Sequence, residues 1–261
     1  MKTVSSQTSS PETRILGLIP ARWESSRFPG KPLHSLLGKP LLQHVVERAR
    51  LCQEIDHLAV ATDDDRIESL CSQIGVDCLQ TRRDHPSGTD RIAEAAAQIT
   101  GEKPSHVFNI QGDEPLLDPQ LLDSLIRVMK EEPELPMITA ASPITEDAQQ
   151  DDPNIVKVVL NSLGNALYFS RSCIPYRRTA VPSLPSYRHI GLYGYHADFL
   201  THFVTLSPSP LEQAEGLEQL RALESGACIR VVITDHEAIG LDSPDQIPHI
   251  ERLLAEDRAS L

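Results

Sequence analysis

The sequence predicts an α/β protein with a mainly parallel central sheet, helices on both faces of it, and a small mixed or antiparallel insertion. In the first half of the chain, short apolar runs alternate with amphipathic segments, as in successive βαβ units. The alternation stops near Glu132, after which strand-like segments follow one another. A chain of 261 residues is long enough to bury a core without disulfides or structural metals.

The elements of the first half follow from apolar periodicity. Strands are expected at residues 15–19, 57–61, 76–79 and 106–110, and helices at 40–52, 65–74, 89–99 and 119–131. In the second half, strands are expected at 137–143, 154–160, 166–170, 189–195 and 228–234, and helices at 211–224 and 244–256. We expect residues 14–261 to form one domain, since no flexible linker divides them, and residues 1–13 to form a disordered tail.

The overall composition excludes several functions. A net charge of −13 argues against an extended basic face for nucleic acid or an anionic membrane. The five cysteines include no Cys-x-x-Cys pair and are odd in number, which favours a reducing compartment. There is no signal-like apolar segment at the start and no apolar run near the ~18 residues of a membrane span. We therefore expect a cytoplasmic protein that binds neither nucleic acid nor membranes.

The loop after the first predicted strand carries the strongest functional signal. It places Arg22, Arg27 and Lys31 on a segment whose Pro and Gly residues prevent continuous helix or strand. Three cations and several backbone donors can then converge on one anion at the carboxyl edge of the sheet. The spacing is neither the Walker form nor the dinucleotide fingerprint. The alternative is that all three are solvated cations on a surface loop.

Two aspartates are candidate metal ligands. Asp113 follows the predicted strand 106–110 in the string Gln-Gly-Asp-Glu-Pro, and Asp242 lies between the last strand and the last helix. A carboxylate that faces bound phosphates suits Mg²⁺, which takes one or two protein carboxylates and completes its shell with phosphate oxygens and water. For Asp113 the alternative is a turn former, and for Asp242 a helix cap before Pro244.

A third polar loop joins the strand at 76–79 to the next helix. Residues 81–91 supply hydroxyls, a glycine and several cations. Either Ser87 or Thr89 is expected to cap the helix.

These strings together are similar to known sequences. Pro-Ala-Arg, Ser-Ser-Arg and Pro-Gly-Lys-Pro-Leu resemble the signature loop of the sugar nucleotidyltransferases, in particular of the cytidylyltransferases that activate acidic sugars. The resemblance implies a nucleotide-diphospho-sugar-transferase α/β fold and a CTP site with Mg²⁺ on Asp113 and Asp242. The nucleotide-binding residues that it implies are Pro20, Ala21, Arg22, Ser25, Arg27, Lys31, Arg82, Ser87 and Gly88, the last three near cytosine.

The second half resembles the members that activate 3-deoxy-manno-octulosonate (Kdo), through Tyr-Phe-Ser-Arg-Ser, His-Ile-Gly-Leu-Tyr-Gly-Tyr and Pro-Leu-Glu-Gln-Ala-Glu followed by Leu-Glu-Gln-Leu-Arg. The implied sugar-binding residues are Arg171, His189, Tyr193, Glu212 and Gln213. A planar guanidinium suits a carboxylate, whereas the others suit hydroxyls. Taken singly, His189 and Tyr193 are equally consistent with core residues, and Glu212 with a solvated first-turn charge.

The resemblance therefore implies an enzyme that couples CTP to Kdo in lipopolysaccharide biosynthesis, with Arg22, Lys31, Asp113 and Asp242 as its catalytic residues. Residues 14–132 and 226–261 would form mainly the nucleotide and metal site, and residues 133–225 the sugar-binding and dimerisation region of a homodimer. The alternatives are a sialate-activating relative, a metal-dependent glycosyltransferase and a non-catalytic nucleotide-binding regulator. The retained Asp113 and Lys31 argue against the regulator.

Overall fold

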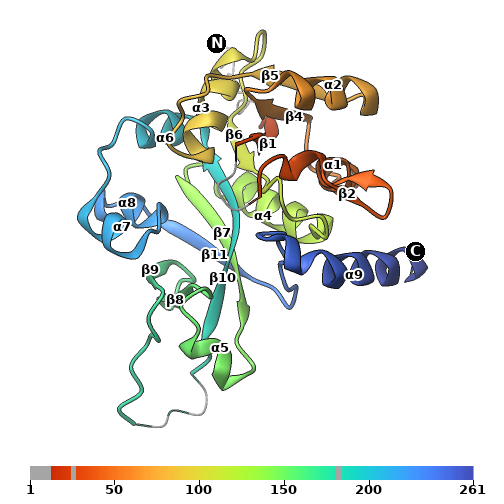
Figure 1. Ribbon diagram of the computed structural model, residues 1–261. Coiled ribbons are helices and arrows are strands. Elements are labelled where there is room, and N and C mark those ends of the chain that lie inside the picture. The colour runs from red at the N-terminus through yellow and green to blue at the C-terminus, as the bar shows by residue number, and fades with distance from the viewer. Residues whose placement is uncertain (1–12, 25–27, 180, 182–183, 261) are drawn as a thin grey trace, which may run out of the picture.

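The computed structural model describes residues 13–24, 28–179, 181 and 184–260. Its central sheet has the strand order β11-β7-β10-β6-β1-β4-β5, and a hairpin of β8 and β9 is attached to β10 (Figure 1). The strands of this sheet are β1 (Ile15–Ala21), β4 (His57–Thr62), β5 (Asp77–Gln80), β6 (His106–Asn109), β7 (Met137–Pro143), β8 (Lys157–Leu160), β9 (Ala166–Ser170), β10 (Tyr187–His196) and β11 (Ile229–Ile233). Two short strands, β2 (Ser35–Leu36) and β3 (Lys39–Pro40), pair separately.

The sheet is mixed, as predicted. Strands β6, β1, β4 and β5 are parallel to one another, and β11 is parallel to β7. Strand β10 runs antiparallel to β6, β7 and β8, and β8 runs antiparallel to β9. The two parallel parts are therefore joined through one long antiparallel strand.

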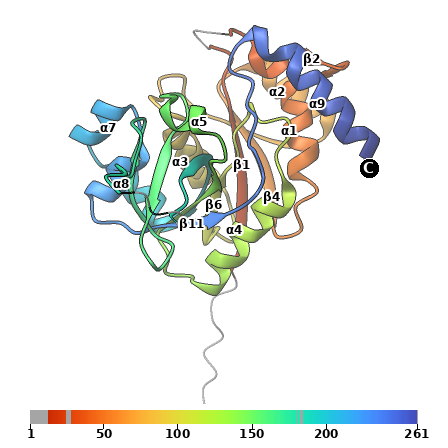
Figure 2. The same cartoon turned by 90° about the horizontal axis from the view of Figure 1, so that it is seen from below.

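Helices cover both faces of the sheet. They are α1 (Leu41–Ala49), α2 (Asp65–Ile74), α3 (Gly88–Gln98), α4 (Pro119–Glu131), α5 (Asp147–Asp151), α6 (Ala197–Phe203), α7 (Pro210–Glu215), α8 (Gln219–Glu224) and α9 (Ile247–Ser260), with 3-10 turns η1 (Lys31–Leu33) and η2 (Pro244–Gln246). Figure 2 shows α1, α2 and α9 on one side and α3, α7 and α8 on the other. No helix in the described part of the chain is both long and apolar enough to cross a membrane.

Strand β1 shows why the core has two layers. Ile15 and Ile19 pack with α1, α2 and α4, whereas Leu16 and Leu18 pack with α3 and α6 on the opposite face. Alternate side chains of a strand point to opposite faces, so an apolar run with helices on both sides is buried on both. These four side chains are at most 1% exposed.

The predicted helix at 211–224 is two helices in the structure. Helix α7 ends at Gly216, which has φ 63° and donates its N–H to the Glu212 carbonyl. This left-handed conformation is a common helix terminus that glycine adopts without steric cost. The prediction of one continuous helix was therefore wrong, and α8 starts afresh at Gln219.

Candidate functional site

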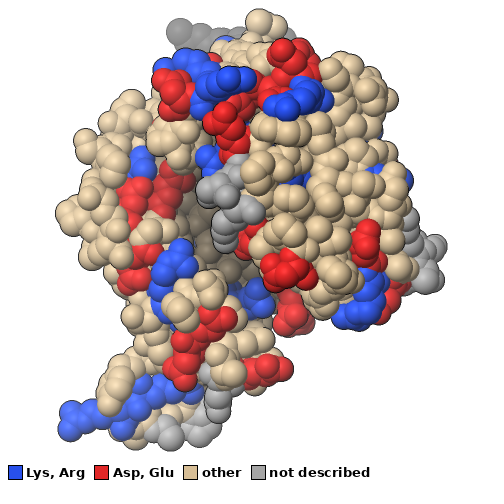
Figure 3. All heavy atoms as spheres, viewed as in Figure 1, with Lys and Arg blue, Asp and Glu red and all other residues tan. Residues whose placement is uncertain are grey.

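A cavity of about 260 Å³ lies at the carboxyl ends of the central parallel strands. Strand β1 pairs with β4 as far as Ala21 but with β6 only as far as Leu18, so the chains after β1 and β6 diverge there. Open α/β sheets bind ligands at such a point. Figure 3 shows a hollow in this face, with charged side chains of both signs around it. The lining residues are Pro20, Ala21, Arg22, Lys31, Pro32, His85, Pro86, Ser87, Gly88, Arg91, Gln111, Gly112, Asp113 and Asp242.

Gly112 allows two segments that line the cavity to pack closely. A Cβ atom at this position would lie 2.7 Å from the carbonyl oxygen of Pro20, closer than any side chain tolerates. The loop after β6 therefore packs directly on the end of β1 because residue 112 has no side chain. This contact brings Asp113 beside the loop that follows β1.

Lys31 joins three segments of the site. Its Nζ donates a hydrogen bond to Asp113 Oδ2 at 2.6 Å and another to the Leu241 carbonyl at 2.9 Å. The preceding Gly30 takes a left-handed conformation, with φ 72°, and starts the 3-10 turn that carries Lys31. The first loop, the loop after β6 and the segment before η2 thus meet at one ammonium group, as the sequence predicts for Lys31 and Asp113.

Asp242 lines the same cavity as Asp113, from a segment 129 residues further along the chain. The sequence left open whether Asp242 caps the following helix. In the structure, Ser243 and Gln246 form the capping box of η2, so the N-cap is Ser243. Asp242 therefore contributes a carboxylate to the cavity wall from just before the capped turn.

These two carboxylates fit a magnesium ion that is shared with a phosphorylated ligand. No group of three or more His, Cys, Asp or Glu side chains suited to a metal occurs among the described residues. A complete protein cage is therefore missing from this part of the chain. Two hard oxygen donors beside an open cavity are the set that Mg²⁺ uses when phosphates and water supply its other ligands.

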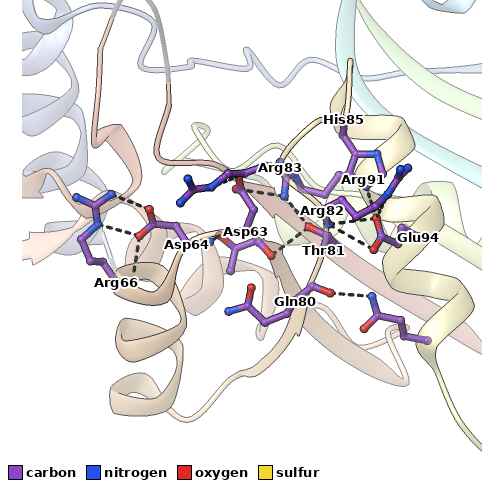
Figure 4. A network of polar contacts seen from close by, with 12 residues as sticks. Asp63, Asp64, Arg66, Gln80, Thr81, Arg82, Arg83, His85, Arg91 and Glu94 are labelled. Atoms are coloured by element: carbon purple, nitrogen blue, oxygen red, sulfur yellow. Dashed lines mark hydrogen bonds and ion pairs between the residues drawn. The ribbon is translucent and has the colours of Figure 1, made fainter.

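The predicted base-binding loop lies on the opposite wall. Ser87 is the N-cap of α3, and its Oγ accepts the Asp90 N–H at 3.1 Å, so the sequence was right to expect a cap here. Ser87 and Gly88 also line the cavity. Arg82 does not line it: its guanidinium faces Asp84 and Glu94 in the polar network of Figure 4.

Two further residues of this loop line the cavity, although the sequence analysis assigned them no role. Arg91 is 4% exposed, donates to Thr81 Oγ1, and lies 3.2 Å from Asp63 Oδ1. His85 Nε2 makes a very short contact with Glu94 (Figure 4). Both belong to the segment 81–91, which the sequence analysis singled out. The sequence did not show which side chains of that segment point into the cavity.

Gln111 connects the cavity to the antiparallel half of the sheet. Its Nε2 donates to the Gly191 carbonyl at 2.8 Å, at the irregularity where β10 shifts register against β7. His189 and Tyr193 flank this irregularity, and their rings lie 5.3 Å apart. His189 Nε2 also lies 3.0 Å from Thr139 Oγ1. Neither His189 nor Tyr193 lines the 260 Å³ cavity.

The other predicted sugar residues are held by the protein itself. Arg171 donates through Nε to the Glu215 carbonyl and through Nη1 to the Pro153 carbonyl. The Glu212 carboxylate accepts hydrogen bonds from the Ser209 N–H and, at 2.8 Å, from Arg221 Nε. It therefore takes part in the capping box of α7 and in an ion pair with Arg221. Gln213 is exposed and donates to the Pro208 carbonyl. None of these three lines the cavity, and predicted residues Ser25 and Arg27 lie outside the described residues.

In the next Glu-Gln pair along the chain, the glutamine is buried and the glutamate contacts α3. Gln219 is 5% exposed. Glu218 accepts a hydrogen bond at 2.6 Å from Thr89 Oγ1, beside the cavity residue Gly88. The sequence contains both pairs, and the pattern alone did not reveal that the second one contacts the helix that carries Gly88.

Burial shifts the pKa of several groups around the site. Burial, and then the charge of Asp113, raise the pKa of Glu114 to about 8. Burial lowers the pKa of His189 to about 3, so this imidazole is neutral at physiological pH. The Arg91 pKa is also lowered by burial. A neutral His189 can accept as well as donate a hydrogen bond.

The switch-point cavity, lined by both cations and two aspartates, is typical of α/β proteins that bind nucleotides through a metal. A family model described as Cytidylyltransferase matches residues 16–235. The chain therefore belongs to the cytidylyltransferase family.

Comparisons with individual proteins show which cytidylyltransferases this chain is similar to. The 3-deoxy-manno-octulosonate cytidylyltransferase of Syntrophotalea carbinolica is 46% identical over 245 residues, covering 91% of this chain and 97% of that protein. The mitochondrial enzyme of the same name from Arabidopsis thaliana is 42% identical over 251 residues, covering 95% and 86%. A solved CMP:2-keto-3-deoxy-manno-octonic acid synthetase in complex with CTP has a TM-score of 0.89 at 40% identity, covering 94% of this chain and all of that one.

Proposed function

We propose that this protein transfers the cytidylyl group of CTP to Kdo, giving CMP-Kdo and pyrophosphate. The observation that carries the proposal is the convergence of Lys31, Asp113 and Asp242 on one cavity. Relatives that bear the name of this activity, at 42–46% identity over nearly the whole chain, support it. A neighbour solved with CTP supports the choice of nucleotide.

In the proposed reaction, the anomeric hydroxyl of Kdo attacks the α-phosphorus of CTP in line. The new bond is between that oxygen and phosphorus, the bond to the bridging oxygen breaks, and pyrophosphate leaves. Arg22, Lys31 and Arg91 line the cavity and would offset the negative charge that grows on the leaving group. No side chain need act as nucleophile, because positioning and electrostatics are the main means of catalysis at phosphorus.

Asp113 and Asp242 are the residues that would hold Mg²⁺. When bound, the ion would neutralise phosphate oxygens and lower the pKa of the attacking hydroxyl. In the structure, Lys31 holds the Asp113 carboxylate and the Leu241 carbonyl together. It thereby keeps the two metal-binding segments at one wall of the cavity.

The sugar would lie toward β10, beyond Gln111. We propose that His189 and Tyr193 contact its hydroxyls and that Arg171 faces its carboxylate. In support, Gln111 links the cavity to the β10 irregularity that carries the two rings. Gln213 is exposed and available for a hydroxyl, whereas the carboxylate of Glu212 is engaged by Arg221 and serves the fold of α7.

We also propose a homodimer. Large apolar side chains are exposed around the β8–β9 hairpin and the chain that follows it, namely Leu163 (72%), Leu167 (60%) and Tyr176 (88%). The chain that follows β9 projects away from the central sheet in Figure 1. Exposed large apolar side chains are typical of interfaces. A cytoplasmic role in lipopolysaccharide synthesis follows from the proposed product.

The decisive experiment measures pyrophosphate release from CTP and Mg²⁺ with Kdo, with sialate and with no acceptor. We expect release with Kdo only. Release with sialate alone would favour the sialate-activating alternative, and binding of CTP without release under any condition would favour a regulator.

A further inference from the structure

The ring of Trp23 contacts two parts of the protein beside the cavity. One is Gly30, where a Cβ atom would lie 2.8 Å from the indole ring. The guanidinium carbon of Arg66 lies over the ring, 3.3 Å from its centroid. The Trp23 carbonyl also accepts the Gly30 N–H at 3.0 Å. The two ends of the first loop therefore contact each other, and the Arg66 cation stacks on the Trp23 ring at this contact.

Arg66 is held in this orientation by Asp64. The two form a bidentate pair, with Nε to Oδ1 at 2.9 Å and Nη2 to Oδ2 at 2.6 Å (Figure 4). Asp64 is itself 6% exposed and caps α2 by accepting the Arg66 N–H. A bidentate pair on a buried cap fixes the plane of the guanidinium, which stacking on an aromatic face requires.

The stack lies between the two described cations of the first loop. Arg22 directly precedes Trp23, Lys31 directly follows Gly30, and both cations line the cavity. A movement of the ring would therefore shift both. Arg66 does not line the cavity, and its contact with Trp23 links it to the loop that carries both cations.

We propose that Arg66 and Trp23 are positioning residues for the triphosphate, with Arg66 acting through the indole ring. The inference rests on the proposed function of this cavity as the CTP site. It assigns to the first turn of α2 a task beyond helix capping: to hold the loop so that Arg22 and Lys31 face the same anion.

The test compares Arg66→Ala with Arg252→Ala. Arg252 is a suitable control because its side chain is 57% exposed, against 54% for Arg66, and it also forms an ion pair, on α9. We expect Arg66→Ala to raise KM for CTP about tenfold, while KM for Kdo matches that of Arg252→Ala. The melting temperature of Arg66→Ala should fall below that of the control, because the buried Asp64 carboxylate loses its partner, whereas Glu256 is exposed. Trp23 is the one tryptophan of the chain. Its emission should therefore shift in Arg66→Ala and not in the control.

Conservative variants separate positioning from general stability. Trp23→Phe keeps an aromatic face and should retain most of the CTP affinity, measured by calorimetry, whereas Trp23→Ala should resemble Arg66→Ala. The double variant Trp23→Ala with Arg66→Ala should be no worse than either single one, because both remove the same stack. Additive losses would contradict the proposal.

A shifted Trp23 emission with unchanged KM for CTP would overturn the inference, since the stack would then be structural only. Equal rises in KM for both substrates would overturn it too. Failure of the proposed function is recognised separately: the unmodified protein would release no pyrophosphate, while CTP binding could still be titrated by Trp23 fluorescence.

Discussion

Lys31 Nζ lies 2.6 Å from Asp113 Oδ2, and the two residues come from segments 82 positions apart. The side chains are 15% and 32% exposed, so the pair is only partly screened by water. The same ammonium reaches the Leu241 carbonyl, next to Asp242. One cation therefore links the first loop to Asp113, one predicted metal ligand, and to the residue next to Asp242, the other.

Replacing Asp113 should stop catalysis without unfolding the protein. In Asp113→Ala the cavity loses a proposed metal ligand and Lys31 loses its carboxylate partner, so Mg²⁺-dependent pyrophosphate release should fall by at least about 10²-fold. Far-ultraviolet circular dichroism should be unchanged because Asp113 lies outside the strands and helices. Normal turnover in this variant would remove Asp113 from the mechanism.

Gly112→Ala should damage the same site through the backbone. The added methyl would lie 2.7 Å from the Pro20 carbonyl oxygen, so the loop after β6 must move away from β1. We expect a loss of roughly 1–3 kcal/mol in unfolding free energy, typical of overpacking, and a clear fall in turnover. At Gly191 an added Cβ would meet nothing nearer than 3.9 Å, so Gly191→Ala is the stability control. Equal urea midpoints for the two variants would contradict this prediction.

The parallel half of the fold was predictable because its signals are local. Helices α2 and α4 have the bounds that their apolar periodicity predicts, residues 65–74 and 119–131. Each begins after an aspartate N-cap and buries one face. The short helix α6 at 197–203 was missed, because seven residues hold too few turns for a periodic signal.

The motifs that form the site could be predicted from the sequence, but which of their side chains point into the cavity could not. Lys31 and Asp113 meet as expected because parallel strands end at one edge of the sheet. Arg82 and Arg91 occupy the same motif, yet only Arg91 lines the cavity, since it lies on the buried side of α3. Glu212 and Glu218 begin identical Glu-Gln pairs. Glu212 pairs with Arg221 and Glu218 accepts from Thr89 because of how α7 and α8 pack, and that is a tertiary property.

Acid should destabilise the protein through His106. This side chain is 1% exposed, and burial, followed by the nearby His196, lowers its pKa from 6.5 to about 4. Between those values the unfolded chain binds a proton that the folded protein excludes, so stability is present above pH 6.5 and lost as the pH falls toward 4. The loss from this site should approach roughly 3 kcal/mol.

Urea unfolding at several pH values between 7.5 and 4 measures this loss. His106→Gln, which cannot be protonated in this range, should show a shallower decline than the unmodified protein, although it starts from a lower stability. Parallel declines for the two proteins would show that the acid sensitivity originates elsewhere.

Lys157 should control Kdo binding from inside the protein. It is 0% exposed, and its Nζ donates to the carbonyls of Asp152, Ile155 and Arg171 at 2.5–2.9 Å. The lysine thereby links the segment before β8 to Arg171, the proposed sugar-binding residue that directly follows β9. Burial lowers the pKa of Lys157, so the three carbonyl dipoles are needed to hold its charge.

In Lys157→Met the stem still fills the interior, but the three carbonyls lose their donor. An unsatisfied buried group costs roughly 1–3 kcal/mol, so the melting temperature should fall. KM for Kdo should rise while the Kd for CTP stays unchanged, because the proposed CTP cavity is lined by other loops. Lys39→Met, which removes a partly exposed ion pair with Glu47, is the control and should alter neither constant. If Lys157 acts through Arg171, the double variant Arg171→Ala with Lys157→Met should raise KM for Kdo no further than Arg171→Ala alone. A larger rise in the double variant would show that Lys157 does not act through Arg171.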